Sequence, residues 1–183
     1  MTLASIVVLT NIAFTTAFDT STRCPSWVYY DSSPTNIVAM PRMPHGFSAD
    51  PRVAESDNAI DYGRSGFDRG HMAPAADFNF NKAALTETYL FSNICPQLPT
   101  LNRGEWAQIE REVRELAKGQ EVHVLTFPDY NPAETNLMGR VRIPHGFYKV
   151  AWGGFGVKIW HVKQELFIEE KTEEQSTPLL QPN

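Results

Sequence analysis

The residues best suited to chemistry form the tetrapeptide Asp68-Arg69-Gly70-His71. A histidine that is largely neutral near physiological pH can accept a proton from water, and the planar, permanent cation of arginine suits phosphate oxygens. Residues two apart in an extended segment point to the same face, so Arg69 and His71 could face one phosphate. Gly70 allows a close backbone approach between them. Taken alone, the tetrapeptide could equally be a surface strand with an Asp68–Arg69 ion pair and a solvated histidine.

A helix is expected from about Arg103 to Lys118, downstream of this motif. Its apolar positions are spaced three, four and three residues apart, which defines one helical face: Trp106, Ile109, Val113 and Leu116. Asn102 is placed to cap the amino end of the helix, and Gly119 to end it. The sequence therefore predicts a helix that begins at a carboxamide side chain.

Glu110 and Arg114 are four residues apart on this helix and so are neighbours on its surface. On spacing alone they could be an ordinary surface pair.

The rest of the chain is expected to be mostly strands and loops. Residues 4–18 favour a β-hairpin, residues 27–30 a strand after the breaker Pro25, and residues 69–73 a short strand. Residues 88–95 could be a strand or an irregular crossing segment. Further strands are expected at 121–127, 143–152 and 155–163, the last two joined at Gly153-Gly154, while 31–58 and 129–142 favour loops.

Three segments in order carry a resemblance to a known family. After Asp68-Arg69-Gly70-His71 come Ser92-Asn93-Ile94-Cys95-Pro96-Gln97 and then Leu101-Asn102-Arg103-Gly104-Glu105-Trp106, which leads to Glu110 and Arg114. In this order and spacing they resemble the DNA/RNA non-specific endonucleases, the ββα-metal nucleases. The resemblance covers roughly residues 10–152. It implies an α+β fold with a central antiparallel β-sheet, flanking helices and a ββα-metal (His-Me finger) element.

The resemblance implies a metal-dependent hydrolysis of phosphodiester bonds. His71 would be the general base that activates water, and Asn102 the one protein ligand of a mostly water-coordinated Mg²⁺ ion, for which Mn²⁺ could substitute. Arg69 would bind the scissile phosphate and stabilise its developing charge. A single amide oxygen suits this ion because magnesium prefers oxygen and keeps several waters. The products would carry 5′-phosphate and 3′-hydroxyl ends.

Four further residues receive roles from the same resemblance. Glu110 would take part in catalysis by orienting the waters of the hydrated ion. Arg114 would contact a substrate or product phosphate. Asn93 and Arg52 would belong to the substrate-binding part of the site, Asn93 by shaping it. The alternative is a catalytically inactive nucleic-acid-binding protein on the same fold.

Composition sets wider bounds on these expectations. The net charge is −5, against the basic character usual for a nucleic-acid partner. However, residues 165–183 carry five acids and one base, so the remainder is near neutral at −1 and a local basic groove is compatible with it. Sugar preference stays open, and no base-reading module for sequence-specific cleavage is evident.

Residues 1–168 are expected to form a single domain, and 169–183 a polar, disordered tail. Cys24 and Cys95 are expected to be reduced thiols rather than a disulfide. No Lys or Arg precedes Arg23, so a cleaved signal peptide is disfavoured. A cytoplasmic location is therefore expected, with secretion as the alternative. No membrane span is expected, and the resemblance allows a homodimer.

Overall fold

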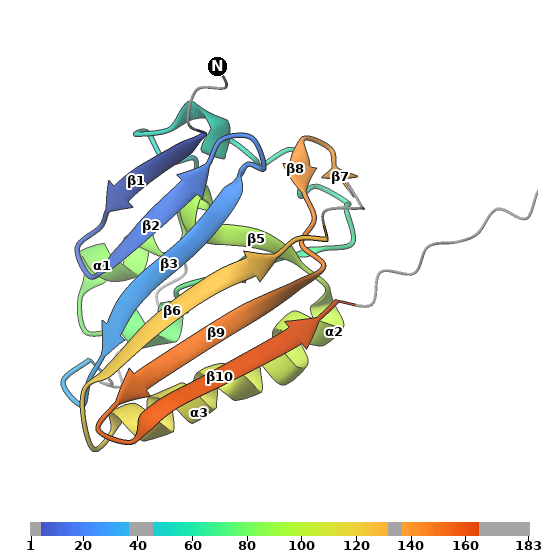
Figure 1. Ribbon diagram of the computed structural model, residues 1–183. Coiled ribbons are helices and arrows are strands. Elements are labelled where there is room, and N and C mark those ends of the chain that lie inside the picture. Colours follow the sequence, from blue (N-terminus) through green and yellow to red (C-terminus); the bar gives the residue numbers. More distant parts are fainter. Residues whose placement is uncertain (1–4, 37–45, 132–136, 165–183) are drawn as a thin grey trace, which may run out of the picture.

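A six-stranded antiparallel sheet forms the centre of the molecule in the computed structural model, which describes residues 5–36, 46–131 and 137–164 (Figure 1). The strand order is β1-β2-β3-β6-β9-β10. The strands are β1 (Ile6–Thr10), β2 (Phe14–Asp19), β3 (Cys24–Ser32), β6 (Val122–Asp129), β9 (Gly146–Gly153) and β10 (Gly156–Lys163). Neighbouring strands pair antiparallel throughout. With the helices on one face, this is the α+β fold that the sequence predicts.

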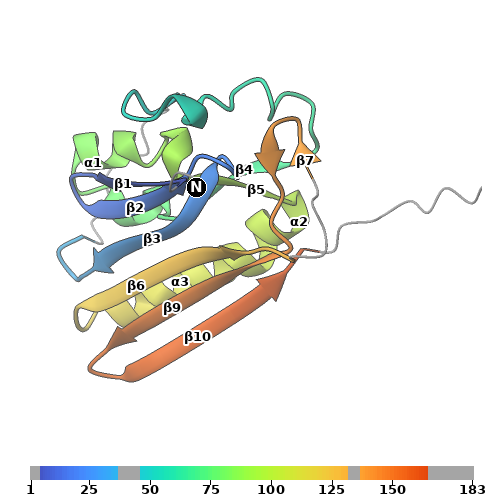
Figure 2. The ribbon, with the colours of Figure 1, turned by 45° about the horizontal axis from the view of Figure 1, so that its top comes forward.

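Alternation along the strands separates an inner from an outer face of the sheet. In β6, Val122, Val124 and Thr126 are buried, whereas the side chains between them are partly exposed. The long helix α3 (Ala107–Ala117) packs its buried stripe on the inner face, into the same core as Val122 and Val124 (Figure 2). The helices and the second sheet, which contains the motif strand, lie on this side of the central sheet.

The second sheet contains the motif strand. Its strands are β4 (Asp68–His71) and β5 (Ile94–Gln97), paired antiparallel. Between them the chain forms η2 (Ala75–Phe78), α1 (Lys82–Glu87) and η3 (Phe91–Asn93). After β5 follow α2 (Pro99–Leu101), a π-helical turn η4 (Asn102–Trp106) and α3. Smaller elements are η1 (Ala54–Ser56), β7 (Leu137–Met138) and β8 (Val141–Arg142). Two strands followed by a helix make the ββα arrangement that the resemblance implies.

The helix begins earlier than predicted, and Asn102 does not cap it. The helical run starts at Pro99, which occupies the first turn after the N-cap residue Leu98. Asn102 itself has helical dihedral angles, φ −57° and ψ −44°. Gly104 then departs from helical geometry, with φ −102° and ψ −107°, so the chain is kinked within η4.

The strands of the central sheet confirm two predicted hairpins and correct one predicted strand start. The hairpin within 4–18 is confirmed as β1 and β2, and β9 and β10 meet at the predicted glycine turn. Pro25 does not break a strand, because β3 runs through it where a bulge shifts the register opposite Ala17 and Phe18. The tail at 169–183 lies outside the described residues. None of the helices in the described part of the chain is long and apolar enough to cross a membrane.

Candidate active site

Two hydrogen bonds join the motif strand to the π-helical turn. The Asn102 carboxamide nitrogen donates to Asp68 Oδ2 at 2.9 Å. The indole nitrogen of Trp106 donates to the backbone oxygen of His71 at 3.4 Å. Asp68 and His71 are the two ends of β4, and Asn102 and Trp106 are the two ends of the turn. The two segments therefore run beside each other, and the structure brings the proposed base and the proposed metal ligand into one site.

Asp68 fixes which way the Asn102 carboxamide points. The guanidinium of Arg103 donates to both Asp68 oxygens, at 2.8 and 2.6 Å. This contact holds the pKa of Asp68 below its usual range against the opposing effect of burial, and the Asn102 amide adds to the lowering. A carboxylate can only accept hydrogen bonds, so it must face the amide nitrogen and not the amide oxygen. The ion pair of Asp68 is thus with Arg103 and not with Arg69.

The remaining atom of Asn102 fits a hard cation. Its carboxamide oxygen accepts no hydrogen bond from any residue that the structure describes, and the side chain is partly exposed. A neutral oxygen donor held from behind by a carboxylate matches the preference of magnesium for few protein ligands and retained water.

Arg69 and His71 approach the same aromatic ring. The guanidinium carbon of Arg69 lies 5.3 Å from the centre of the Phe47 ring and 5.7 Å from that of Tyr62. The His71 ring lies 5.5 Å from Phe47 and 5.1 Å from Tyr89, which it meets edge-on. The guanidinium of Arg69 thus makes cation–π contacts with both rings. Because Arg69 is exposed in β4, this cation is also accessible to a phosphate in solution.

Asn93 holds the chain that follows His71. Its side chain is fully buried and accepts from Ala73 N at 2.9 Å. The same side chain donates to the backbone oxygens of Ala73 and Thr88, each at 2.9 Å. All its polar atoms are engaged inside the protein, which agrees with a role in shaping the site through the backbone, whereas the predicted place among the substrate-binding residues stays a prediction.

Arg52, whose substrate-binding role stays a prediction, belongs to a hydrogen-bond network within the protein. Its guanidinium pairs with the buried Asp50 at 2.6 Å and donates to Thr10 O and the Asn11 side chain. Ser92 donates to the other side of the network, to Asp50 Oδ2 at 2.6 Å. Arg52 therefore ties β1 to the segment that leads to the site.

Glu110 and Arg114 line a pocket of about 440 Å³ that adjoins His71. The pocket also includes Tyr89, whose ring contacts the His71 ring. Arg114 donates to the buried Asp77 at 2.9 Å, so its partner is Asp77 and not the neighbouring Glu110. The arrangement leaves Arg114 facing the pocket as a half-buried cation suited to phosphate.

Burial raises the pKa of Glu110 to about 7, and Asp77 adds to the effect while Lys149 and Arg114 oppose it. Because the folded state binds this proton more tightly than the unfolded chain, its stabilising contribution is present below about pH 4.5 and is lost as pH rises through about 7. We therefore expect the free energy of unfolding, measured by chemical denaturation, to fall less between pH 4.5 and pH 8 in Glu110→Gln than in the wild type. Equal losses would contradict the shifted pKa.

Gly70 is required by a close approach between the two short strands. A methyl group at this position would overlap the side chain of Gln97, which is fully buried. Gly70→Ala should therefore destabilise the fold by about 1–3 kcal/mol through overpacking. The melting temperature should recover in part when Gln97→Ala is added. A double variant no more stable than Gly70→Ala would refute this steric account.

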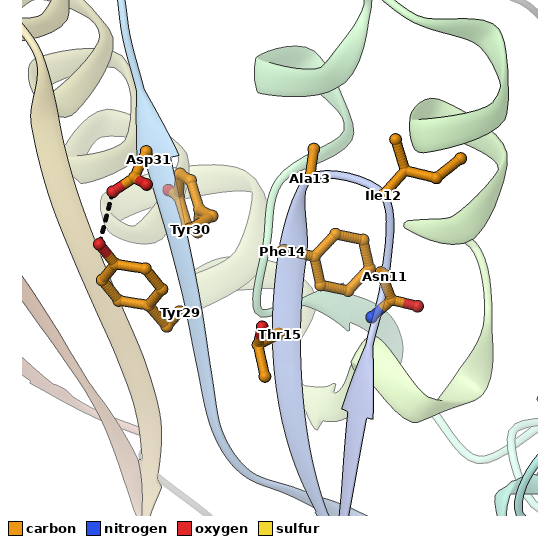
Figure 3. A pocket seen from close by; sticks show the side chains of 8 residues that line it. All are labelled: Asn11, Ile12, Ala13, Phe14, Thr15, Tyr29, Tyr30 and Asp31. Carbon is orange, nitrogen blue, oxygen red and sulfur yellow. Dashed lines mark hydrogen bonds between the residues drawn. The ribbon is translucent and has the colours of Figure 1, made fainter.

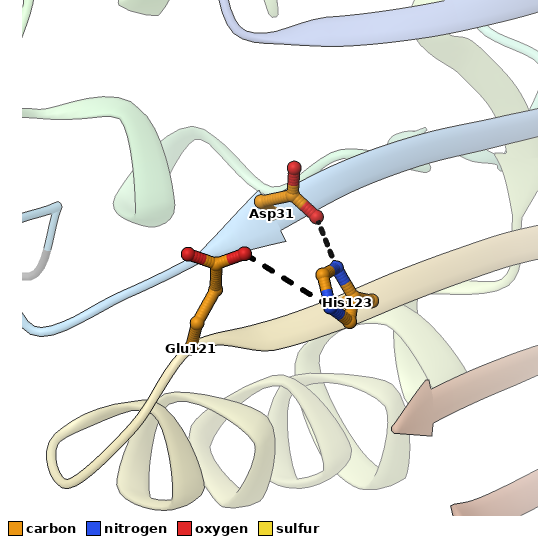
Figure 4. Close-up of side chains that lie close together, drawn as sticks. All are labelled: Asp31, Glu121 and His123. Carbon is orange, nitrogen blue, oxygen red and sulfur yellow. Dashed lines mark hydrogen bonds and ion pairs between the residues drawn. The ribbon is translucent and has the colours of Figure 1, made fainter. Parts of the chain in front are cut away.

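Two other features lie apart from this site. A hollow of about 260 Å³ between the β1–β2 turn and β3, bordered by Asn11, Phe14 and Tyr30 among others, contains no basic side chain in its lining (Figure 3). Among the described residues, one group of three side chains could hold a metal ion: Asp31, Glu121 and His123 (Figure 4).

That group lies on the outer face of the sheet, away from the candidate site. Asp31 meets His123 Nδ1 at 2.7 Å, whereas Glu121 lies 3.9 Å from the opposite ring nitrogen, Nε2. The carboxylates thus approach different sides of the imidazole, and the first of them already engages it in a hydrogen bond. We assign Asp31, Glu121 and His123 no part in the chemistry of the candidate active site.

Sequence reasoning overlooked two groups that shape the site. Asp77 is the buried partner of Arg114. Lys149 is fully buried on the inner face of the sheet. Each is a charged residue at an inward position of an otherwise apolar segment, and this pattern was the signal in the sequence that could have identified it.

The sequence and the fold agree with one family. Residues 2–179 match the model of the DNA/RNA non-specific endonuclease family, so the chain belongs to that family. Similar proteins include the mitochondrial nuclease of Saccharomyces cerevisiae, 35% identical over 136 residues, which are 71% of this chain and 41% of the relative. The mitochondrial nuclease EXOG of Xenopus laevis is 34% identical over 87% of this chain and 44% of the relative. Human mitochondrial endonuclease G is 31% identical over 75% of this chain and 52% of the relative.

The chain thus spans about half the length, or less, of these curated relatives. A crystal structure of the EndoG/EndoGI complex contains a chain of the same fold. The TM-score is 0.77 at 24% identity, over 89% of this chain and 76% of that one. The cytoplasmic location expected from the sequence is contradicted, because these relatives from yeast, frog and human are mitochondrial nucleases.

Proposed function

We propose that this chain is a metal-dependent endonuclease that hydrolyses phosphodiester bonds of DNA, RNA or both with little sequence specificity. The observation that carries the proposal is the hydrogen bond from Asn102 to Asp68, which places a carboxamide oxygen donor beside the strand that ends in His71. The nuclease names of the relatives support the reaction class.

In the proposed reaction His71 accepts the proton of the attacking water. A general base of this kind contributes about a hundred- to ten-thousand-fold to a rate. Arg69, carried by the Phe47 and Tyr62 rings, binds the phosphate that is attacked and balances its growing charge. Arg114 binds a neighbouring phosphate from the adjoining pocket.

The metal in this proposal is magnesium, held by Asn102 Oδ1, with manganese as a substitute. When bound, such an ion polarises the phosphate and favours departure of the leaving oxygen. Glu110 acts in its carboxylate form and orders water at the mouth of the pocket. Since its pKa is about 7, the active form prevails above neutral pH.

A digestion experiment tests the proposal directly. Supercoiled plasmid, single-stranded DNA and RNA are each incubated with the protein and Mg²⁺, with and without EDTA. We expect cleavage of plasmid without preferred fragments, abolished by EDTA, with 5′-phosphate ends. A band shift without cleavage, under Mg²⁺ or Mn²⁺, would instead support the inactive binding protein.

A further inference from the structure

A buried lysine that the proposed mechanism does not use lies behind the site. Lys149 is in β9 and points to the inner face, where it is fully buried. Its ammonium donates to Thr126 Oγ1 at 2.8 Å and to the backbone oxygen of Met72 at 3.5 Å. Met72 directly follows His71, so the ammonium contacts the backbone that carries the proposed base.

Lys149 also contacts the aromatic side chain that holds the base from the other side. Its ammonium lies 4.8 Å from the centre of the Trp106 ring and 5.6 Å from that of Tyr30. The Trp106 indole in turn donates to the His71 backbone oxygen. One cation therefore contacts Met72 and the indole that binds the carbonyl of His71.

Charged groups of both signs face this ammonium. The groups are Glu110 and Arg114 on α3 and Asp77 on η2, and the neutral phenol ring of Tyr30 on β3 lies beside them. Burial lowers the pKa of Lys149 to about 8, while Glu110 and Asp77 act in the opposite direction. Buried charges of this kind often stabilise a fold no better than apolar side chains of similar size. Stability alone thus gives no reason for an ammonium at this point.

We propose that Lys149 is a positioning residue for the nuclease reaction: its ammonium fixes the Met72 carbonyl, and hence the His71 backbone, and supplies the positive charge behind Glu110. The inference rests on the proposed function, because it assigns a purpose to the geometry of that same site. Lys149 is not exposed and does not touch the substrate.

Two substitutions separate positioning from packing. Lys149→Met keeps the aliphatic volume and removes the ammonium, and Lys149→Arg keeps a cation. Phe147→Leu is the matched control, because Phe147 is buried two residues away on the same strand and packs on Trp106 without a charge. All variants are compared with the wild type at a temperature where thermal melting shows each to be folded.

For Lys149→Met we expect kcat to fall about 10- to 100-fold with KM within about twofold, because misplacing a reacting group costs rate more than binding. The rise of kcat with pH should move to higher pH, because Glu110 loses a cation. Lys149→Arg should recover most of kcat, whereas Phe147→Leu should lower the melting temperature and leave the pH profile unchanged. A Lys149→Met enzyme with wild-type kcat and pH profile would overturn the proposal.

A further variant and a second readout protect the test. Should Lys149→Met fail to fold, Thr126→Val removes the hydrogen bond that directs the ammonium while keeping the side-chain shape. It should lower kcat as Lys149→Met does, and an unchanged kcat would overturn the proposal.

Carboxyl-carbon NMR of Glu110 gives a readout that does not depend on turnover. The titration of the Glu110 carboxyl group should move to higher pH in Lys149→Met. If the Glu110 titration moves in Lys149→Met but the wild-type protein has no nuclease activity, only the proposed function is refuted. If the titration does not move, the charge role of Lys149 is refuted.

Discussion

Replacing His71 with alanine is expected to lower the rate of plasmid cleavage about a hundred- to ten-thousand-fold while leaving the fold intact. The imidazole is the proposed acceptor for the proton of water, and alanine has no group that can replace it. The fold should survive because the His71 backbone oxygen, which accepts from Trp106, keeps this contact when the side chain is removed. Initial rates of plasmid nicking and far-ultraviolet circular dichroism measure the two expectations.

A second histidine provides the control for this experiment. His161 lies on β10 and binds Asp129 at 2.8 Å on the outer face of the sheet. His161→Ala removes the same ring from a place with no proposed role, so its nicking rate should stay within about twofold of the wild type. If His71→Ala kept its rate, the proposed base would be wrong, whatever the result at His161.

Replacing Asn102 with alanine is the other change with a large expected effect. The loss of the proposed ligand oxygen should lower the rate at least about 100-fold at a Mg²⁺ concentration that saturates the wild type, since even outer partners of metal ligands change affinity or activity 10- to 100-fold. Higher Mg²⁺ should restore part of the activity. A titration of rate against Mg²⁺ concentration measures the shift.

Asp68→Asn and Asn81→Ala make the Asn102 experiment specific. Asp68→Asn removes the charge that fixes the Asn102 amide, so its Mg²⁺ requirement should rise, but less than for Asn102→Ala. Asn81 caps helix α1 by accepting from Ala83 and Ala84, and its loss should cost about 1 kcal/mol of stability without changing the Mg²⁺ requirement. A wild-type Mg²⁺ dependence in Asn102→Ala would remove this residue from the metal site.

The local patterns predict much of the fold. Alternation in 121–127 and the helical spacing of Trp106, Ile109 and Val113 mark the strand and the helix whose apolar sides form the core. The start of the helix is harder to predict, because Asn102 has the chemistry of a cap. Only the geometry at Pro99 shows that the helical run begins before Asn102. Short-range pattern therefore identifies the elements better than their ends.

The partners of polar side chains are the part that the sequence could not supply. Arg52 pairs near the chain start with Asn11, and Asn93 with Ala73, through contacts that depend on how distant segments meet. The lysine at 149 reads as one polar residue in an alternating strand until the sheet and α3 enclose it. Motif order can suggest which residues gather, whereas only the tertiary structure shows which of them face inward and what they touch.

Three successive residues, the last of the motif and the two that follow it, are hydrogen-bonded to three different parts of the molecule: His71 to the π-helical turn, Met72 to the central sheet and Ala73 to the end of η3. A loop held in this way has little freedom to adapt to its ligand. Under the proposed function, the nucleic acid must then bend to fit a rigid active site. Stiff stretches of duplex should therefore be cleaved more slowly than flexible ones. Such an enzyme would be indifferent to base identity yet sensitive to the mechanics of the polymer that it cleaves.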